Sequence, residues 1–289
     1  MVLVAGATGS LGRKVVNGLL ERGKVVRALA RPRSQYGPLE RAGANVVPGD
    51  LKDRASLDRA CQGVAAVITT ASVSKTGDDS VENVDLHGNQ NLIAAADAAG
   101  VRHFVFVSTL RASVDSPVPL FHAKGMAETA LRESRMAWTI LQANAFMDVW
   151  FPMLIEAPML AGRDVTLVGE SRGRHSFVAE QDVAAFAIAA LQTPAARRAT
   201  VAIGGPEVLT FTDVVRAYEE AAGRHIPVRR VAPGEPIPGV PEPIWGIAAA
   251  LEAYDSPVPM EETSRRYGVS PTSVRDFARS RLAASPRSG

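Results

Sequence analysis

Cysteine, aromatic residues and long apolar runs are all scarce in this chain of 289 residues. The single cysteine, Cys61, excludes an internal disulfide and a metal site made of several cysteines, and it is typical of a reducing compartment. The longest apolar stretches, such as 183–191, are too short or too rich in alanine to cross a bilayer. The first residues form an apolar run without a basic leader. We therefore expect a cytoplasmic protein without a membrane span or a bound metal.

A surplus of charge of one sign is missing too. The 32 Lys and Arg residues against 30 Asp and Glu residues give a net charge of +2, and the basic residues form no long tract. We therefore expect a small molecule, and not a nucleic acid, as the partner of this protein. The sequence leaves open whether the protein is a homo-oligomer. A hydrophobic fraction of 46% indicates a globular protein, long enough for one large and one small domain.

What the chain does have is a glycine-rich start, V-L-V-A-G-A-T-G-S-L-G over residues 2–12. Residues 2–5 are typical of a buried parallel strand, and 11–20 have the apolar spacing of an amphipathic helix. A glycine turn between a strand and a helix presents backbone N–H groups and the positive helix end to a phosphate. The alternative is an ordinary structural turn. We expect six residues of this turn to contact a dinucleotide: Gly6, Thr8, Gly9, Ser10, Leu11 and Gly12.

Strand-like and helix-like segments alternate through the first half. Further strands are expected at 25–29, 45–47, 65–68, 104–107 and 138–141, with helices at 35–42, 54–60, 81–99 and 120–134 between them. Such alternation requires right-handed crossovers and parallel strands. The expected fold is therefore α/β, with a doubly wound parallel Rossmann sheet, and its ligands bind at the carboxyl ends of the strands.

After Asn144 the pattern changes. Strands are expected at 165–168, 176–178 and 200–203, helices at 181–191, 213–222 and 273–281, a Pro-rich loop at 233–243 and a frayed tail at 283–289. We expect residues 1–150, rejoined by about 175–205, to form an NADP-binding Rossmann domain. Residues 206–289 would then form a small C-terminal α/β cap that binds the substrate.

The end of the second strand predicts the cofactor. It continues into Arg31-Pro32-Arg33, with no acidic residue before Glu40. NAD enzymes usually place a carboxylate there for the ribose hydroxyls, whereas an arginine suits the 2′-phosphate of NADP. The alternative is that these arginines are solvated loop charges. NADP(H) is the expected cofactor, with Arg31 as its phosphate ligand.

Two further strand ends carry candidate cofactor contacts. Asp50 and Leu51 follow the third strand, where a carboxylate could accept from the adenine amino group and a leucine could pack on the ring. Asp50 could also cap the next helix. Thr70, Ala71 and Ser72 follow the fourth strand, and their small side chains leave room for a dinucleotide above them.

Several motifs together resemble one family. They are V-x-V-x-G-A-T-G-x-L-G, R-A-L-x-R, G-D-L at 49–51, N-V-D-x-x-G-N-x-N-L-I at 83–93, A-G-V-R-H-F-V-F-V-S at 99–108 and F-V-A-E-Q-D-V-A at 177–184. Over about residues 1–230 the chain resembles the NmrA-like branch of the atypical short-chain dehydrogenase/reductases. That branch includes NADPH-dependent quinone oxidoreductases, triphenylmethane reductases and redox-sensing regulators.

The resemblance implies site residues. Ordinary relatives use a serine and a Y-x-x-x-K pair; Ser108 and Lys124 stand where that serine and lysine belong, but Leu120 replaces the tyrosine. Lys124 would then hold the nicotinamide ribose, although a lysine on an amphipathic helix is often only solvated. Residues 142–146 would flank the nicotinamide, which makes Ala143, Asn144 and Phe146 cofactor contacts and Asn144 a third catalytic candidate besides Ser108 and Lys124.

The expected function is an NADPH-dependent oxidoreductase acting on a hydrophobic, conjugated acceptor such as a quinone, an enone or a dye. These acceptors delocalise the charge that hydride transfer brings, so the missing tyrosine acid is tolerable. The alternative is a non-catalytic NADP(H)-binding redox sensor of the NmrA type. A nucleotide-sugar epimerase is disfavoured, because it needs the tyrosine that Leu120 replaces.

Overall fold

The computed structural model of the protein describes residues 1–73 and 78–284. The fraying expected for 283–289 falls mostly on residues outside this range. The chain divides into two compact units. Unit 1 comprises Met1–Ala143, Glu180–Ala202 and Arg265–Val269, and unit 2 comprises Asn144–Ala179, Ile203–Ser264 and the described residues from Ser270 on.

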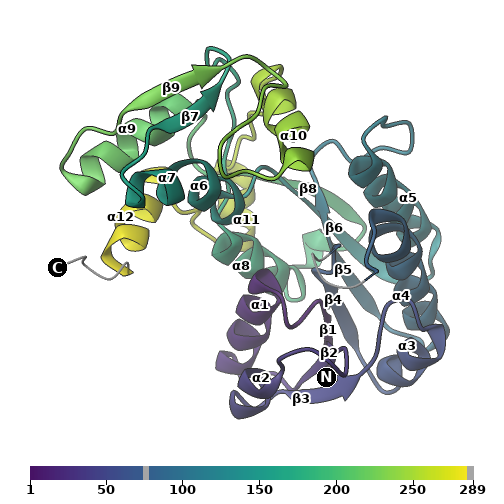
Figure 1. Cartoon of the computed structure of the whole chain (residues 1–289). Coiled ribbons are helices and arrows are strands. Elements are labelled where there is room, and N and C mark those ends of the chain that lie inside the picture. Colours follow the sequence, from purple (N-terminus) through teal and green to yellow (C-terminus); the bar gives the residue numbers. More distant parts are fainter. Residues whose placement is uncertain (74–77, 285–289) are drawn as a thin grey trace. The chain divides into compact units, whose positions relative to one another are not determined.

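Unit 1 contains a seven-stranded sheet in the order β3-β2-β1-β4-β5-β6-β8 (Figure 1). Its strands are β1 (Val2–Ala5), β2 (Val26–Ala30), β3 (Asn45–Pro48), β4 (Ala66–Thr69), β5 (His103–Thr109), β6 (Ala137–Ala143) and β8 (Ala199–Ile203). The pairings from β3 through to β6 are all parallel. This is the strand order of a doubly wound Rossmann sheet and confirms the expected fold class.

Helices cover both faces of this sheet. They are α1 (Ser10–Glu21), α2 (Gly37–Arg41), α3 (Arg54–Cys61), η1 (Val81–Leu86), α4 (His87–Ala98), α5 (Pro119–Glu133), α8 (Glu180–Ala190) and the short η3 (Pro194–Ala196); α11 (Glu261–Tyr267) ends in the same unit. In Figure 1, α3, α4 and α5 line one face and α1 and α8 the other. The helix α1 is amphipathic, and it buries Val15, Val16 and Leu19 completely.

The strand order reverses between β1 and β4, so the carboxyl ends of these two strands form the switch point at which such sheets bind ligands. The turn after β1 and the residues after β4 lie against each other there. The backbone N–H of Thr70 donates to the Ala5 carbonyl at 3.0 Å. Two segments that are about 65 residues apart in sequence therefore form one surface.

Unit 2 is smaller and has its own core. Its elements are α6 (Met147–Phe151), η2 (Pro152–Glu156), α7 (Ala157–Leu160), β7 (Val165–Val168), α9 (Phe211–Ala222), β9 (Val228–Val231), α10 (Glu242–Glu252) and α12 (Val274–Ala284), with β7 and β9 paired in parallel. Phe151 is fully buried in this core, edge-on to the rings of Phe177, Tyr218 and Phe277. Phe151 therefore packs in the core of unit 2 and is not available to stack on a ligand.

Two of the expected helices and strands take another form in the structure. The expected helix at 81–99 begins as a π-helix, η1, because the Asn89 amide donates to the carbonyls of Val84 and Asp85 and so loosens the backbone ladder. Residues 176–178 form no strand; only isolated bridges pair His175 and Val178 with other segments. Among the described residues, no helix has both the length and the apolar character of a membrane span.

Candidate cofactor-binding site

The glycine turn after β1 is shaped by close backbone contacts. Gly6 has a φ of +76°, and a Cβ there would come within 2.7 Å of the Thr70 hydroxyl. A Cβ on Gly12 would lie 2.1 Å from the Gly6 carbonyl oxygen, so α1 can start this close to the turn only with glycine at position 12. Protein packing therefore explains Gly6 and Gly12.

Gly9 has no such internal reason to be glycine. Its φ is −74°, and a Cβ would approach only the Gly6 carbonyl oxygen, at 3.3 Å. It is exposed and stands at the N-cap of α1, where no side chain caps the helix and no acidic residue occupies the first turn. The first backbone N–H groups of α1 are thus available to a ligand that lies at the N-terminus of the helix, next to Gly9. This arrangement fits a pyrophosphate, whose approach a larger side chain would block.

A pocket of about 280 Å³ lies at the switch point of unit 1. It brings together nine of the expected cofactor contacts: Gly6, Thr8, Gly9, Arg31, Asp50, Leu51, Thr70, Ala71 and Ser72. Four further lining residues were not anticipated from the sequence: Leu29, Gly49, Asp79 and Val84. The pocket therefore joins the ends of β1, β2, β3 and β4 to the segment before η1.

The other candidates of the glycine turn do not line this pocket. The hydroxyl of Ser10 donates to the Glu180 carboxylate, which Lys14 also contacts at 2.7 Å. Leu11 is half-buried, and Gly12 is buried in the contact between the turn and α1. These three residues shape the start of the helix.

Asp50 is not the cap of the next helix. That helix, α3, starts at Arg54, and its N-cap is Asp53, which accepts from the Ala55 N–H at 3.1 Å. Asp50 instead accepts from the backbone N–H of Lys52 at 2.9 Å. Its carboxylate stays at the pocket wall, where the ribose or adenine of a dinucleotide would need an acceptor.

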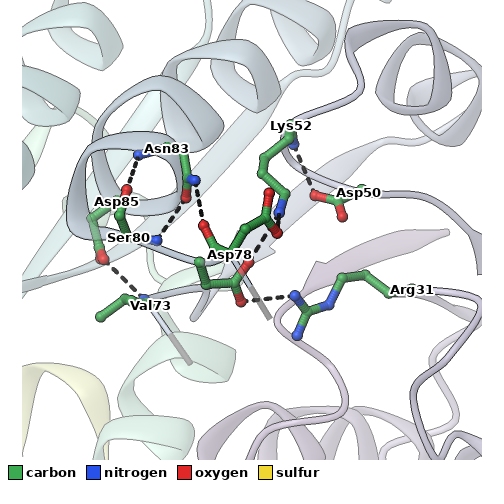
Figure 2. A network of polar contacts seen from close by, with 9 residues as sticks. Arg31, Asp50, Lys52, Val73, Asp78, Ser80, Asn83 and Asp85 are labelled. Carbon is green, nitrogen blue, oxygen red and sulfur yellow. Dashed lines mark hydrogen bonds and ion pairs between the residues drawn. The ribbon is translucent and has the colours of Figure 1, made fainter. Parts of the chain in front are cut away.

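Arg31 meets a carboxylate that the sequence pattern did not indicate. Its guanidinium lies 2.7 Å from Asp79, which also lies 3.2 Å from the Lys52 ammonium. Lys52 contacts the exposed Asp78 at 2.7 Å as well. Figure 2 shows this network between the end of β2, the segment after β3 and the segment before η1. Contact with Asp78 and Asp79 raises the pKa of Lys52, so the ammonium is firmly charged.

Lys124 and Ser108 have different partners. The Lys124 ammonium lies 3.0 Å from the Asp85 carboxylate and donates to the Ala71 carbonyl at 3.2 Å. Ser108 donates to Glu128 at 2.6 Å. Asp85 and Glu128 are buried and were not among the expected site residues, although Asp85 belongs to the N-V-D motif.

The remaining candidates follow β6. Ala143 ends the strand, whereas Asn144 and Phe146 belong to unit 2. The Asn144 side-chain amide donates to the Ser256 carbonyl at 2.7 Å and accepts from the Ala145 N–H at 2.8 Å, so much of its hydrogen-bonding capacity is used within unit 2. Phe146 is the N-cap residue of α6.

His175 is structural. It is fully buried, and its ring nitrogens contact the Ser256 hydroxyl at 2.6 Å and the Leu251 carbonyl at 2.8 Å. Burial lowers its pKa, so the ring is neutral near pH 7. Among the described residues, no group of three or more His, Cys, Asp or Glu side chains is placed to bind a metal ion.

Comparison with known proteins identifies the family to which the chain belongs. Residues 6–194 match the family described as NAD(P)H-binding. The NAD(P)H azoreductase of Xenophilus azovorans is 33% identical over 80% of this chain and 77% of its own length. The photosystem II assembly factor Ycf39 of Trieres chinensis is 31% identical over 80% of this chain and 72% of its own.

A solved structure matches almost the whole chain. It is the Citrobacter triphenylmethane reductase complexed with NADP(H), with a TM-score of 0.81, 24% identity and coverage of 97% of this chain and 99% of that one. At this identity the likeness shows the fold. The chain belongs to the NAD(P)H-binding family, which confirms the NAD(P)-binding class that its motifs indicate.

Proposed function

We propose that the protein is an NADPH-dependent oxidoreductase that reduces a hydrophobic, conjugated acceptor such as a quinone, an enone or a dye. The observation that carries this proposal is the difference between two positions of α5, Lys124 and Leu120. Lys124 is buried and ion-paired with Asp85, but the position one turn earlier, where the acid of ordinary relatives stands, holds Leu120. A fixed cation beside a slot that lacks its tyrosine acid suits an acceptor that delocalises negative charge.

Relatives support a redox reaction. One relative is named an NAD(P)H azoreductase, and the matching structure is that of a triphenylmethane reductase. When bound, NADPH supplies the hydride. The chain itself supplies binding and orientation: Gly9 and the start of α1 for the pyrophosphate, Asp50 for the adenosine and Arg31 for the 2′-phosphate.

In this proposal Lys124 provides a fixed positive charge and transfers no proton. Its ammonium is kept in place by Asp85 and by the carbonyl of Ala71, which lines the cofactor pocket. Lys124 does not itself line that pocket, so its ammonium acts on a bound molecule from behind Ala71, by holding this segment and by its positive charge. Ser108, whose proton is donated to Glu128, can there act only as an acceptor.

The rival function is a non-catalytic NADP(H)-binding sensor. One observation bears on it: several relatives carry the name of an assembly factor rather than of a reductase. The sensor would bind NADPH with the same pocket and the same Arg31. The two functions differ only in whether bound NADPH is oxidised by an acceptor.

Single-turnover kinetics separates the two functions. NADPH is bound first, and its absorbance is followed after mixing with a panel of quinones, enones and triphenylmethane dyes. Oxidation well above that of free NADPH with at least one conjugated acceptor, and little with simple ketones, is the expected result. No oxidation above background by any acceptor, in a protein that binds NADPH, would establish the sensor instead.

Three further features complete the proposal. Residues 1–150 with about 175–205 bind the dinucleotide, and residues 206–289 contribute to recognition of the acceptor. The buried thiol of Cys61 suits the cytoplasm, where we place the protein. The substrate is hydrophobic, and gel filtration at several concentrations tests for a homo-oligomer.

A further inference from the structure

Asp79 forms ion pairs with Arg31, the proposed ligand of the 2′-phosphate, and with Lys52. Its carboxylate contacts Arg31 at 2.7 Å and Lys52 at 3.2 Å, and its side chain is only 3% exposed. Arg31 and Asp79 both line the cofactor pocket, whereas Lys52 does not. The Arg31 guanidinium, which is expected to bind the phosphate, is therefore already ion-paired with a carboxylate of the protein.

We infer that Asp79 is the residue that sets the selectivity of this pocket between NADPH and NADH. The inference rests on the proposed role of Arg31. A 2′-phosphate must compete with the Asp79 carboxylate for the same guanidinium, so Asp79 weakens NADPH binding. NADH carries a hydroxyl in place of that phosphate and does not compete.

Local charge makes this competition severe. Within the described part of the chain, Arg31 and Lys52 stand among three carboxylates, those of Asp50, Asp78 and Asp79, so these five groups carry no surplus of positive charge. A phosphate monoester brings roughly −1.5 to −2 more charge near pH 7. Because Asp79 is almost fully buried, solvent screens its repulsion of a phosphate poorly.

The chain around Asp79 does not let the carboxylate withdraw freely. Ser80 is the N-cap of η1, and it forms a capping box with Asn83 in which both backbone N–H groups are bonded, at 2.8 and 3.1 Å. The Asn83 amide also donates to the Asp78 carbonyl at 2.7 Å. Figure 2 shows these bonds beside the Arg31 network. Moving Asp79 away from Arg31 would disturb this helix start.

Asp79 also supplies the carboxylate that the end of β2 lacks. Rossmann enzymes that use NAD place an acid at that strand end to accept from the ribose hydroxyls, and here Arg31 stands there instead. The fold brings the Asp79 carboxylate into the same pocket from the segment after β4. In this inference the Asp79 carboxylate would accept from a ribose hydroxyl of NADH, and the same negative charge would disfavour the 2′-phosphate of NADPH.

The test measures binding rather than turnover. Isothermal titration with adenosine 2′,5′-bisphosphate and with adenosine 5′-monophosphate isolates the contribution of the 2′-phosphate, and titrations with NADPH and NADH repeat it on whole cofactors. Asp79→Asn removes the charge and keeps the shape. It should bind the bisphosphate about tenfold more tightly, the worth of one charge-assisted contact, while the monophosphate binds equally or more weakly.

Asp78→Asn is the matched control. It makes the same chemical change one residue earlier, but the Asp78 side chain is 85% exposed and contacts Lys52 alone among the two cations. Exposed ion pairs contribute little, so its selectivity should stay within about twofold of the wild type. Arg31→Gln tests the premise, because it should weaken the bisphosphate and not the monophosphate.

The outcomes are distinguishable. If Arg31→Gln weakens the bisphosphate but Asp79→Asn leaves selectivity unchanged, the inference is overturned and the role of Arg31 stands. If Arg31→Gln has no effect, the proposed phosphate ligand itself is wrong, and the inference falls with it. Asp79→Ser, smaller and also neutral, replaces the asparagine variant if that one unfolds. If neither Asp79 variant binds the bisphosphate or the monophosphate, Asp79 is a structural residue and the inference is overturned.

Discussion

The ammonium of Lys124 lies 3.0 Å from a carboxylate oxygen of Asp85, and both side chains are buried, with exposures of 7% and 0%. The ammonium also lies 5.1 Å from the centre of the Phe106 ring. Asp85 accepts from the backbone N–H of Val73 at 2.9 Å. This ion pair thus connects α5 and η1 to the segment after β4, so one pair of charges fixes the wall of the cofactor pocket.

Replacing Lys124 by alanine should cost stability as well as function. It leaves the Asp85 carboxylate buried without its cation, which typically costs about 3–5 kcal/mol of unfolding free energy. Urea denaturation measures this loss, and fluorescence titration should show weaker NADPH binding and single-turnover kinetics slower oxidation. Adding Asp85→Asn should recover part of the stability but not the turnover. Wild-type stability and NADPH binding in Lys124→Ala would show that the pair is incidental.

Arg31→Gln should lower the affinity for NADPH by roughly 1.5–3 kcal/mol, the worth of a charge-assisted hydrogen bond to phosphate. Glutamine is preferable to aspartate here, because an aspartate would face Asp79 and add repulsion of its own. Arg33→Gln, at an exposed position in the same loop, is the control and should bind NADPH normally. Equal losses in both variants would mean that the loop attracts the cofactor only by its general charge.

Gly9→Val should abolish dinucleotide binding and leave the fold intact. The backbone at Gly9 has a φ of −74°, which any residue adopts, and a Cβ there would meet only the Gly6 carbonyl oxygen, at 3.3 Å. The valine side chain would instead fill the space before the helix N-terminus. Circular dichroism and NADPH titration measure the two effects.

Gly12→Ala is the contrasting variant for this turn. Its Cβ would lie 2.1 Å from the Gly6 carbonyl oxygen, so the turn or α1 must shift and stability should fall. A folded Gly9→Val protein that still binds NADPH tightly would show that the turn does not hold the pyrophosphate.

Stability should fall as the pH drops from about 6.5 to 4, in part through His103. Burial, with a smaller contribution from Arg197, lowers the pKa of His103 to about 4. The folded protein therefore binds fewer protons than the unfolded chain within this window. The contribution of His103 to the free energy of unfolding is complete above pH 6.5. About 3 kcal/mol of it is lost progressively toward pH 4.

His103→Gln isolates this contribution. Thr139 donates its hydroxyl proton to the Ala196 carbonyl at 2.7 Å. The His103 Nε2 lies 2.9 Å from the Thr139 hydroxyl oxygen, so it must be the donor to that oxygen. A glutamine can make that donation without titrating. Thermal melts from pH 7 to 4 should show a shallower loss in the variant than in the wild type. Parallel curves would contradict the lowered pKa.

Much of the fold could be predicted because it depends on local patterns. The run at 2–5 and the apolar face of α1 match the structure to within a residue, since strand and helix periodicity are properties of neighbouring residues. The helix α10 escaped prediction because prolines precede it and a proline stands inside its first turn. The π-helix η1 was missed because a side chain outside it, that of Asn89, loosens its backbone.

The sequence by itself determined where the strand ends would carry chemistry. The glycine turn, Arg31 and Asp50 each follow a recognisable strand, and parallel strands bring their carboxyl ends to one edge. The tertiary structure alone decided which charge meets which. Asp79 faces Arg31 across 48 positions of the chain, and Asp85 meets Lys124 from another helix. Such pairings depend on the directions in which distant segments enter the pocket, and no local periodicity encodes those directions.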